Sequence, residues 1–125
     1  MRVFIVSAVI FVLLLGVVVG YQLVSSATEK KVLGLAENLE NQITTQDTSS
    51  KDTFSLLYHK WKSTRNLLMS VSEHADLDKV EEHLENIGSG LKYNNFEDAY
   101  REVKVFKMLL KNIFLNSKPT LTNIL

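Results

Sequence analysis

The segment VFIVSAVIFVLLLGVVVGY (residues 3–21) decides the fold class of this chain, because apart from Ser7 and two glycines it is wholly apolar. No charged side chain occurs between Arg2 and Glu29. As a helix, its nineteen residues span about 28 Å, close to the hydrocarbon thickness of a bilayer of about 30 Å. Tyr21 follows at the depth where amphipathic rings favour the membrane interface. The segment therefore predicts a transmembrane anchor over residues 3–24, after a short tail of residues 1–2.

A cleaved signal peptide is the alternative for this segment, because Ser25-Ser26-Ala27 provides small residues at a possible cleavage site. The apolar regions of signal peptides usually run about 7 to 15 residues, so the length favours the anchor. Arg2 on one side faces Lys30 and Lys31 on the other, and this balance discriminates weakly between orientations. We expect a single-pass protein of the cell membrane with its N-terminus in the cytoplasm and its domain outside.

The rest of the chain has the size and charge of one small domain. The full length of 125 residues accommodates an anchor and one compact domain. Beyond Arg2 there are 13 basic and 14 acidic side chains, a net charge of −1 that gives no general attraction to nucleic acid. The chain contains no cysteine, which excludes disulfides, thiolate metal sites and cysteine nucleophiles. The domain must therefore be held together by its core alone.

Four stripes of apolar residues follow the anchor, each at the three-and-four spacing of a helix face. Their members are Val32, Leu35, Leu39 and Ile43; Phe54, Leu57, Trp61, Leu68 and Val71, with Thr64; Leu77, Val80, Leu84, Ile87 and Leu91; and Phe96, Ala99, Val103, Phe106, Leu110 and Ile113. Short connections let neighbouring helices bury these stripes against one another. The predicted fold is all-α, an N-terminal transmembrane helix followed by an antiparallel four-helix bundle over residues 28–118, with a tail at 119–125. The first bundle helix could simply continue the anchor.

Turn-forming residues separate the stripes. The polar stretch TTQDTSSK (residues 44–51) predicts a loop, with Ser50 or Asp52 as the cap of the next helix. A break is expected at residues 74–76 and a turn at residues 94–95. Gly88 and Gly90 should weaken the third helix or bend it, unless close packing explains them.

Charge favours one order of the helices. Residues 73–85 are rich in acids, whereas residues 51–65 and 101–118 are rich in bases. An acidic third helix between two basic ones suits antiparallel packing and disfavours contact between the second and fourth helices. Exposed ion pairs contribute at most about 1 kcal/mol each, so charge sets register more than stability.

Several features together resemble a known family. They are the N-terminal span, Trp61, His74 with Asp76-Leu77-Asp78, and the closing Leu121-Thr122-Asn123-Ile124-Leu125. The arrangement resembles domain of unknown function family 4363, short membrane proteins from Gram-positive, often spore-forming bacteria. The resemblance covers nearly the whole chain and implies a membrane-anchored helical bundle with no established activity.

His74, Asp76 and Asp78 are the sharpest candidate metal ligands, because imidazole and carboxylate groups bind zinc or manganese. Glu73, Glu81, Glu82 and His83 lie nearby. Their spacing is not diagnostic, and helix capping is the better interpretation: His74 would close one helix as a C-terminal cation, and Asp76 would cap the next.

A basic ridge and a tryptophan are the other candidates. The ridge comprises Arg101, Lys104, Lys107 and Lys111, which could contact anionic lipid head groups or cell-wall polyanions. Its ordinary interpretation is a solvated flank that pairs with the acidic helix. Trp61 lies on an apolar stripe and is expected at the packing centre, where its indole N–H would need a partner. No phosphate loop, nucleophile elbow or zinc-binding histidine pair occurs, so we expect neither enzymatic activity nor a cofactor.

The favoured function is a non-enzymatic, membrane-anchored interaction module that serves as an accessory to another membrane or envelope component. Its expected partners are the bilayer, through residues 3–24, and a membrane protein. Gly16 and Gly20 stand four residues apart, the spacing that lets transmembrane helices approach closely. The alternative is an extracytoplasmic domain that senses a ligand or a metal through the His74 region. Nucleic acid is not an expected partner.

Overall fold

The computed structural model of the chain describes residues 1–117 and consists of four α-helices. Their bounds are Arg2–Thr44 for α1, Ser50–Leu68 for α2, His74–Lys92 for α3 and Phe96–Ser117 for α4. The predicted all-α fold is confirmed. The predicted tail at 119–125 and the ending that contributed to the family resemblance lie outside the described residues.

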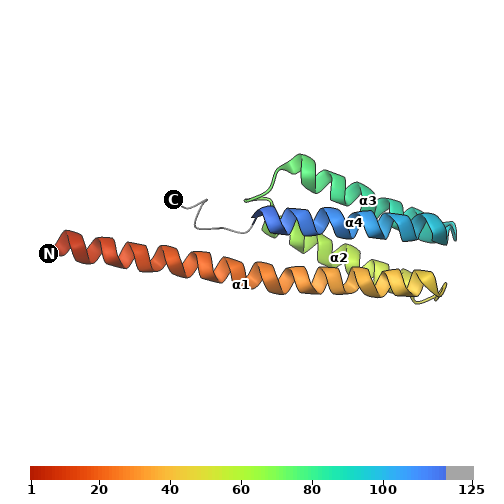
Figure 1. Cartoon of the computed structure of the whole chain (residues 1–125), viewed down its shortest axis with the longest axis horizontal. Coiled ribbons are helices and arrows are strands. Elements are labelled where there is room, and N and C mark those ends of the chain that lie inside the picture. Colours follow the sequence, from red (N-terminus) through yellow and green to blue (C-terminus); the bar gives the residue numbers. More distant parts are fainter. Residues whose placement is uncertain (118–125) are drawn as a thin grey trace.

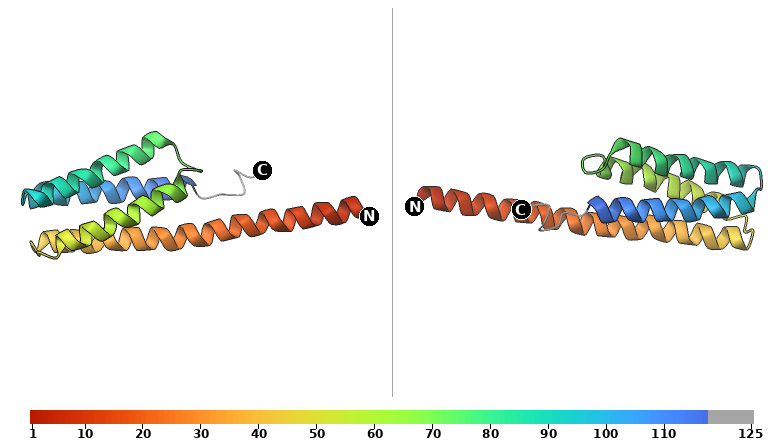
Figure 2. Two further views of the ribbon diagram at one scale, coloured as in Figure 1. Left: turned by 180° about the vertical axis from the view of Figure 1, so that it is seen from behind. Right: turned by 45° about the horizontal axis from the view of Figure 1, so that its top comes forward.

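The bundle is formed by the second half of α1 together with α2, α3 and α4, while the first half of α1 projects from it (Figure 1). Successive helices run antiparallel, and the views from behind and from above show the same arrangement (Figure 2). Helix α1 packs against α2 and α4, and α3 packs against α4 and α2. The predicted anchor and the first bundle helix are thus parts of one continuous helix of 43 residues.

The core is built from the predicted stripes. Every position predicted on the third stripe is buried, and Trp61 and Phe106 are fully buried with their rings edge to face at 6.3 Å between centroids. Phe54, Leu35 and Phe96 are only partly buried at its margin. Val71 was predicted on the second stripe but is 45% exposed. The reason is that α2 ends at Leu68, whose carbonyl accepts the backbone N–H groups of Val71 and Ser72 as the chain turns.

Two helices are each followed, two positions beyond their last residue, by a residue with positive φ. Gln46 (φ 55°) follows α1, and Asn94 (φ 56°) follows α3. After each, a backbone N–H returns five residues to a helix carbonyl, from Asp47 to Gln42 at 2.8 Å and from Asn95 to Gly90 at 2.7 Å. This bonding pattern satisfies carbonyls at a helix end. The predicted turn at residues 94–95 is confirmed.

The predicted caps at two helix starts are wrong. The N-cap of α2 is Ser49, and Ser50 and Asp52 already lie in its first turn. Asp47 instead accepts the Ser49 N–H at 2.9 Å and directs the chain into α2. His74 is the first residue of α3 rather than the end of α2, and Glu73 rather than Asp76 is its N-cap.

Close packing explains both glycines of α3, which runs through them to Lys92 without a break. A Cβ atom on Gly88 would lie 2.6 Å from Cζ of Phe54 on α2. A Cβ atom on Gly90 would lie 3.0 Å from Cβ and 3.1 Å from the backbone nitrogen of Ala99 on α4. The two glycines lower the intrinsic helix propensity of α3, but they let α2 and α4 pack close against it.

Candidate functional site

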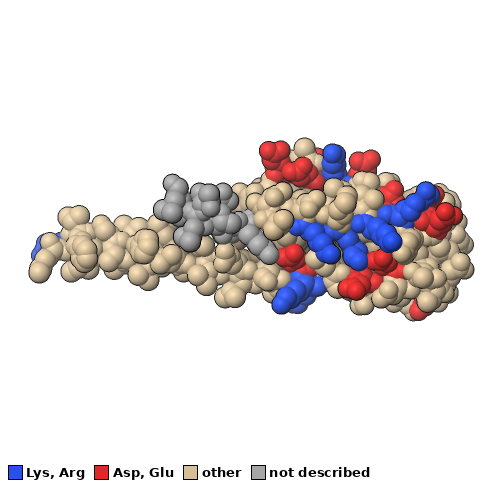
Figure 3. Space-filling model, in the orientation of Figure 1, with Lys and Arg blue, Asp and Glu red and all other residues tan. Residues whose placement is uncertain are grey.

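The projecting half of α1 is the most unusual surface of the molecule. An 18-residue window of this helix has a mean hydropathy of 3.1 and no buried residue. Phe4, Phe11 and Leu14 are each more than half exposed, and Ser25 is the first fully buried residue along the helix. Beyond its tip, this half carries no charge on the face shown in Figure 3. It is long and apolar enough to cross a membrane, and its composition is compatible with an anchor or with a signal peptide.

Gly16 and Gly20 lie on this projecting half. A Cβ atom built on either glycine has no described atom within 4 Å. Their surface therefore makes no close contact within the described part of the chain and is open to a partner helix.

A polar network surrounds Trp61 where α2 meets α3. The indole N–H of Trp61 donates to Oε1 of Glu81 at 3.3 Å, which supplies the partner that its burial requires. Arg65 donates to the other oxygen of Glu81 at 3.3 Å and to Asp78 at 2.7 Å. The hydrogen bond to Asp78 raises the pKa of Arg65. The predicted pairing of a basic second helix with an acidic third helix is confirmed here.

The basic ridge on α4 pairs differently from the expectation. Lys107 donates to Oε2 of Glu40 on α1 at 2.7 Å, and Arg101 pairs with Asp98 on its own helix. The prediction that this flank pairs with the acidic helix is therefore wrong for these two side chains, because α4 lies between α1 and α3 and Lys107 faces α1. A side-chain interaction that does join α4 to α3 is the one between His83 Nδ1 and Glu102, at 2.5 Å.

The two remaining ridge residues point outward. Lys104 lies 4.6 Å from the centre of the Tyr100 ring, and its interaction with the Tyr100 side chain raises the pKa of Lys104. Lys111 is exposed. Basic side chains run along the face of α4 seen in Figure 3, with acidic groups beside them. The ridge is therefore partly neutralised within the bundle.

The structure disperses the candidate metal ligands. His74 begins α3, Asp76 lies within its first turn, and Asp78 pairs with Arg65 at 2.7 Å. Among residues 1–117, no group of three or more histidine, aspartate or glutamate side chains is placed to hold a metal ion.

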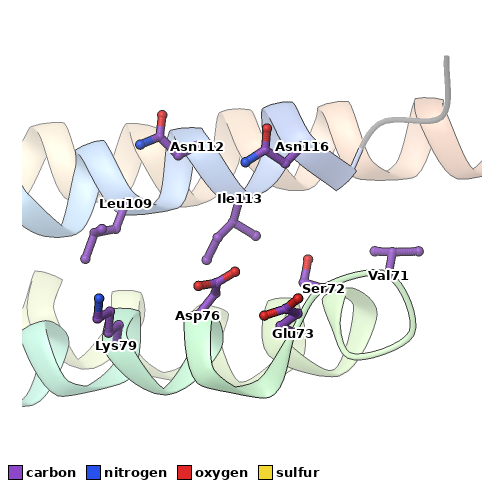
Figure 4. Close-up of a pocket in the computed structure, with 9 residues that line it drawn as sticks. All are labelled: Val71, Ser72, Glu73, Asp76, Lys79, Leu109, Asn112, Ile113 and Asn116. Atoms are coloured by element: carbon purple, nitrogen blue, oxygen red, sulfur yellow. The ribbon is translucent and has the colours of Figure 1, made fainter. Parts of the chain in front are cut away.

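The bundle has a cleft that no sequence motif predicted. It lies between the start of α3 and the end of α4, has a volume of about 390 Å³, and is lined by Val71, Ser72, Glu73, Asp76, Lys79, Leu109, Asn112, Ile113 and Asn116. Leu109 and Ile113 point into it from α4, opposite Asp76 and Lys79 of α3 (Figure 4). Asn112 and Asn116 are directed to the other side of α4 in this view. Val71, Ser72 and Glu73 of its lining belong to the connection that follows the unpredicted end of α2 at Leu68.

The geometry defines a class of protein, an all-helical bundle carried on a long helix whose first half is apolar and exposed. The family model described as domain of unknown function (DUF4363) matches residues 18–124, and the chain belongs to this family. The match begins inside the apolar half of α1 and extends through the whole bundle, as the resemblance of the sequence indicated. No curated protein and no solved structure matches the chain.

Proposed function

We propose that this chain is a single-pass, membrane-anchored and non-enzymatic interaction module, an accessory to another membrane or envelope component. The carrying observation is the exposed apolar half of α1, which continues without a break into the bundle. Exposure of so large an apolar surface to water is unfavourable by about 25 cal/mol per Å². A bilayer removes that cost, and residues 3–24 are long enough to span it.

Retention of the anchor is supported by the residues around the alternative cleavage site. Ser25, Ser26 and Ala27 lie inside α1, and Ser25 is fully buried. Cleavage there would interrupt a helix at the point where the bundle begins. The position of these residues thus favours a permanent anchor over a signal peptide.

An interaction role is supported by how the bundle uses its polar side chains. Trp61 with Glu81, Lys107 with Glu40, and His83 with Glu102 each join two different helices. These groups hold the helices in register. A bundle fixed in this way presents constant surfaces, and membrane tethering raises its effective concentration near a partner, so modest contacts suffice.

The face containing Gly16 and Gly20 is the proposed contact inside the membrane. Small residues four positions apart let two helices approach closely, and these two have no close neighbour within the described chain. The partner is another membrane-spanning helix, from a second copy or from a different protein.

Crosslinking in intact membranes tests both parts of the proposal. The wild-type protein should remain in the membrane after an alkaline wash and should crosslink to a membrane protein. The double variant Gly16→Leu/Gly20→Leu should remain in the membrane but lose most of that crosslink. A matched control is Leu14→Phe/Val18→Phe, which adds bulk two residues before each glycine and hence on the opposite side of the helix.

Two results would contradict the proposal. Release of the wild-type protein by the alkaline wash would remove the anchor and favour a secreted bundle. An unchanged crosslink in the glycine variant, or an equal loss in the control, would show that the glycine face does not mediate the contact.

A further inference from the structure

We infer that the connection between α2 and α3, residues 69–73, lies in the lipid–water interface of the same membrane and contacts lipid through Met69 and Val71. This inference rests on the proposed membrane anchor. It gives the bundle a second contact with the bilayer, separate from α1.

The register of α2 against α1 places this connection at the membrane boundary. The chain turns after Thr44 and re-enters a helix at Ser50, so α2 returns antiparallel along α1. Since both helices rise about 1.5 Å per residue, Leu68 at the end of α2 lies level with about residue 26 of α1. The predicted span ends at residue 24. Figure 1 shows the connection from α2 to α3 at the end of the bundle from which the first half of α1 emerges.

Burial changes abruptly at this point in the chain. Leu68 is fully buried, whereas Met69 is 44% exposed and Val71 is 45% exposed. Val71 lies at the end of the bundle, beyond Ser72 and Glu73 (Figure 4). The connection thus exposes two apolar side chains at the level of the proposed membrane surface. An apolar side chain at this depth is favoured by contact with the boundary between head groups and acyl chains.

The charges of this region decide what kind of lipid surface it fits. Glu73 and Asp76 are exposed close to the connection, and Lys79 is exposed on the next turn of α3. Because the two carboxylates outnumber this ammonium group, the region gives no net attraction to anionic head groups, and the contact depends on the apolar side chains. Ser70 and Ser72 alternate with the apolar residues and supply hydroxyl groups that suit the head-group layer. The surface therefore fits a zwitterionic lipid interface.

Single-cysteine labelling tests this inference cleanly, because the chain has no cysteine of its own. The full-length variants Val71→Cys, Leu14→Cys and Tyr93→Cys would each carry an environment-sensitive fluorophore and be reconstituted in phosphatidylcholine vesicles with brominated acyl chains. Leu14 reports the anchor. Tyr93, which is 72% exposed at the other end of the bundle, is the matched control. Met69→Cys provides a second reporter of the connection, and circular dichroism checks that each labelled variant retains its helices.

The expected result is bromine quenching and emission at shorter wavelength for labels at positions 14, 69 and 71, but not at position 93. Quenching at 14 alone would overturn the inference while leaving the anchor in place, and so would equal quenching at 71 and 93. Absence of quenching at 14 would overturn the anchor itself, and with it this inference.

Discussion

At the scale of single residues, the two glycines of α3 make different contacts and therefore predict different responses to alanine. The Cβ added at Gly90 would meet Ala99, including its backbone nitrogen and Cα at 3.1 and 3.2 Å. Because backbone of α4 cannot yield easily, Gly90→Ala should reduce the free energy of unfolding by about 1 to 3 kcal/mol. Denaturant unfolding of the full chain in detergent measures this loss.

Gly88→Ala is the matched comparison in that experiment. Its Cβ would meet the far end of the Phe54 ring, a side chain that is only partly buried and able to turn. Both substitutions gain about 1 kcal/mol of helix propensity, and at Gly88 this gain offsets much of the smaller cost of moving the ring. Equal destabilisation by both substitutions, or a larger loss at Gly88, would contradict this account of the packing.

Glu81 predicts a second effect at this scale, because it satisfies the buried indole of Trp61. Glu81→Ala leaves that N–H without its acceptor and should reduce the free energy of unfolding by about 1 to 3 kcal/mol. Glu81→Gln keeps an amide oxygen in reach and should lose less. The fluorescence of Trp61, the single tryptophan of the chain, follows unfolding directly. A smaller loss for alanine than for glutamine would contradict the proposed role.

Some features of single residues could be predicted from the sequence, and others could not. The burial of Trp61 and its need for a partner were predictable, because an apolar stripe and an indole N–H impose them. The identity of the partner was not, since Glu81 comes from a different helix and its position depends on the register between α2 and α3. Ala36 also escaped prediction, although it is fully buried, because a small side chain contributes little to an apolar pattern.

At the scale of elements, helix type and order were predictable, whereas ends and lateral contacts were less so. The period of the stripes requires helices, and four of them with short connections favour an antiparallel ring. The end of α2 at Leu68 was missed because Val71 continues the apolar pattern even though the chain has already turned. The cleft beside this connection also had no motif to predict it, because its lining comes from three separate segments of the chain.

The contact between α1 and α4 supplies the prediction at this scale. Lys107 and Glu40 lie 2.7 Å apart and both are mostly buried, with side-chain exposures of 22% and 17%. A double-mutant cycle of Glu40→Gln and Lys107→Met should give a coupling free energy of about 1 kcal/mol. Lys111→Met, paired with the same Glu40→Gln, should give almost none. Equal coupling for both lysines would show that the pair does not align α1 with α4.

At the scale of the whole molecule, the side of the membrane on which the bundle lies can be tested directly. We expect the bundle outside the cytoplasm, so the exposed variant Tyr93→Cys should react with a membrane-impermeant maleimide in intact cells. Leu14→Cys, within the proposed span, should stay unreactive under the same conditions. Labelling of position 93 only after cell lysis would place the bundle in the cytoplasm and reverse the proposed orientation.

Because α1 is one continuous helix, the bundle would follow the orientation of its first half when that half is held in a bilayer. The helix is continuous from residue 24 to residue 44, so the bundle would take the angle of the proposed span. A tilt of about 20°, average for membrane helices, would carry the far end of α1 about 10 Å sideways over the roughly 30 Å from the boundary to Thr44. A partner that changes the angle of the span would therefore sweep the bundle across the membrane surface as one body.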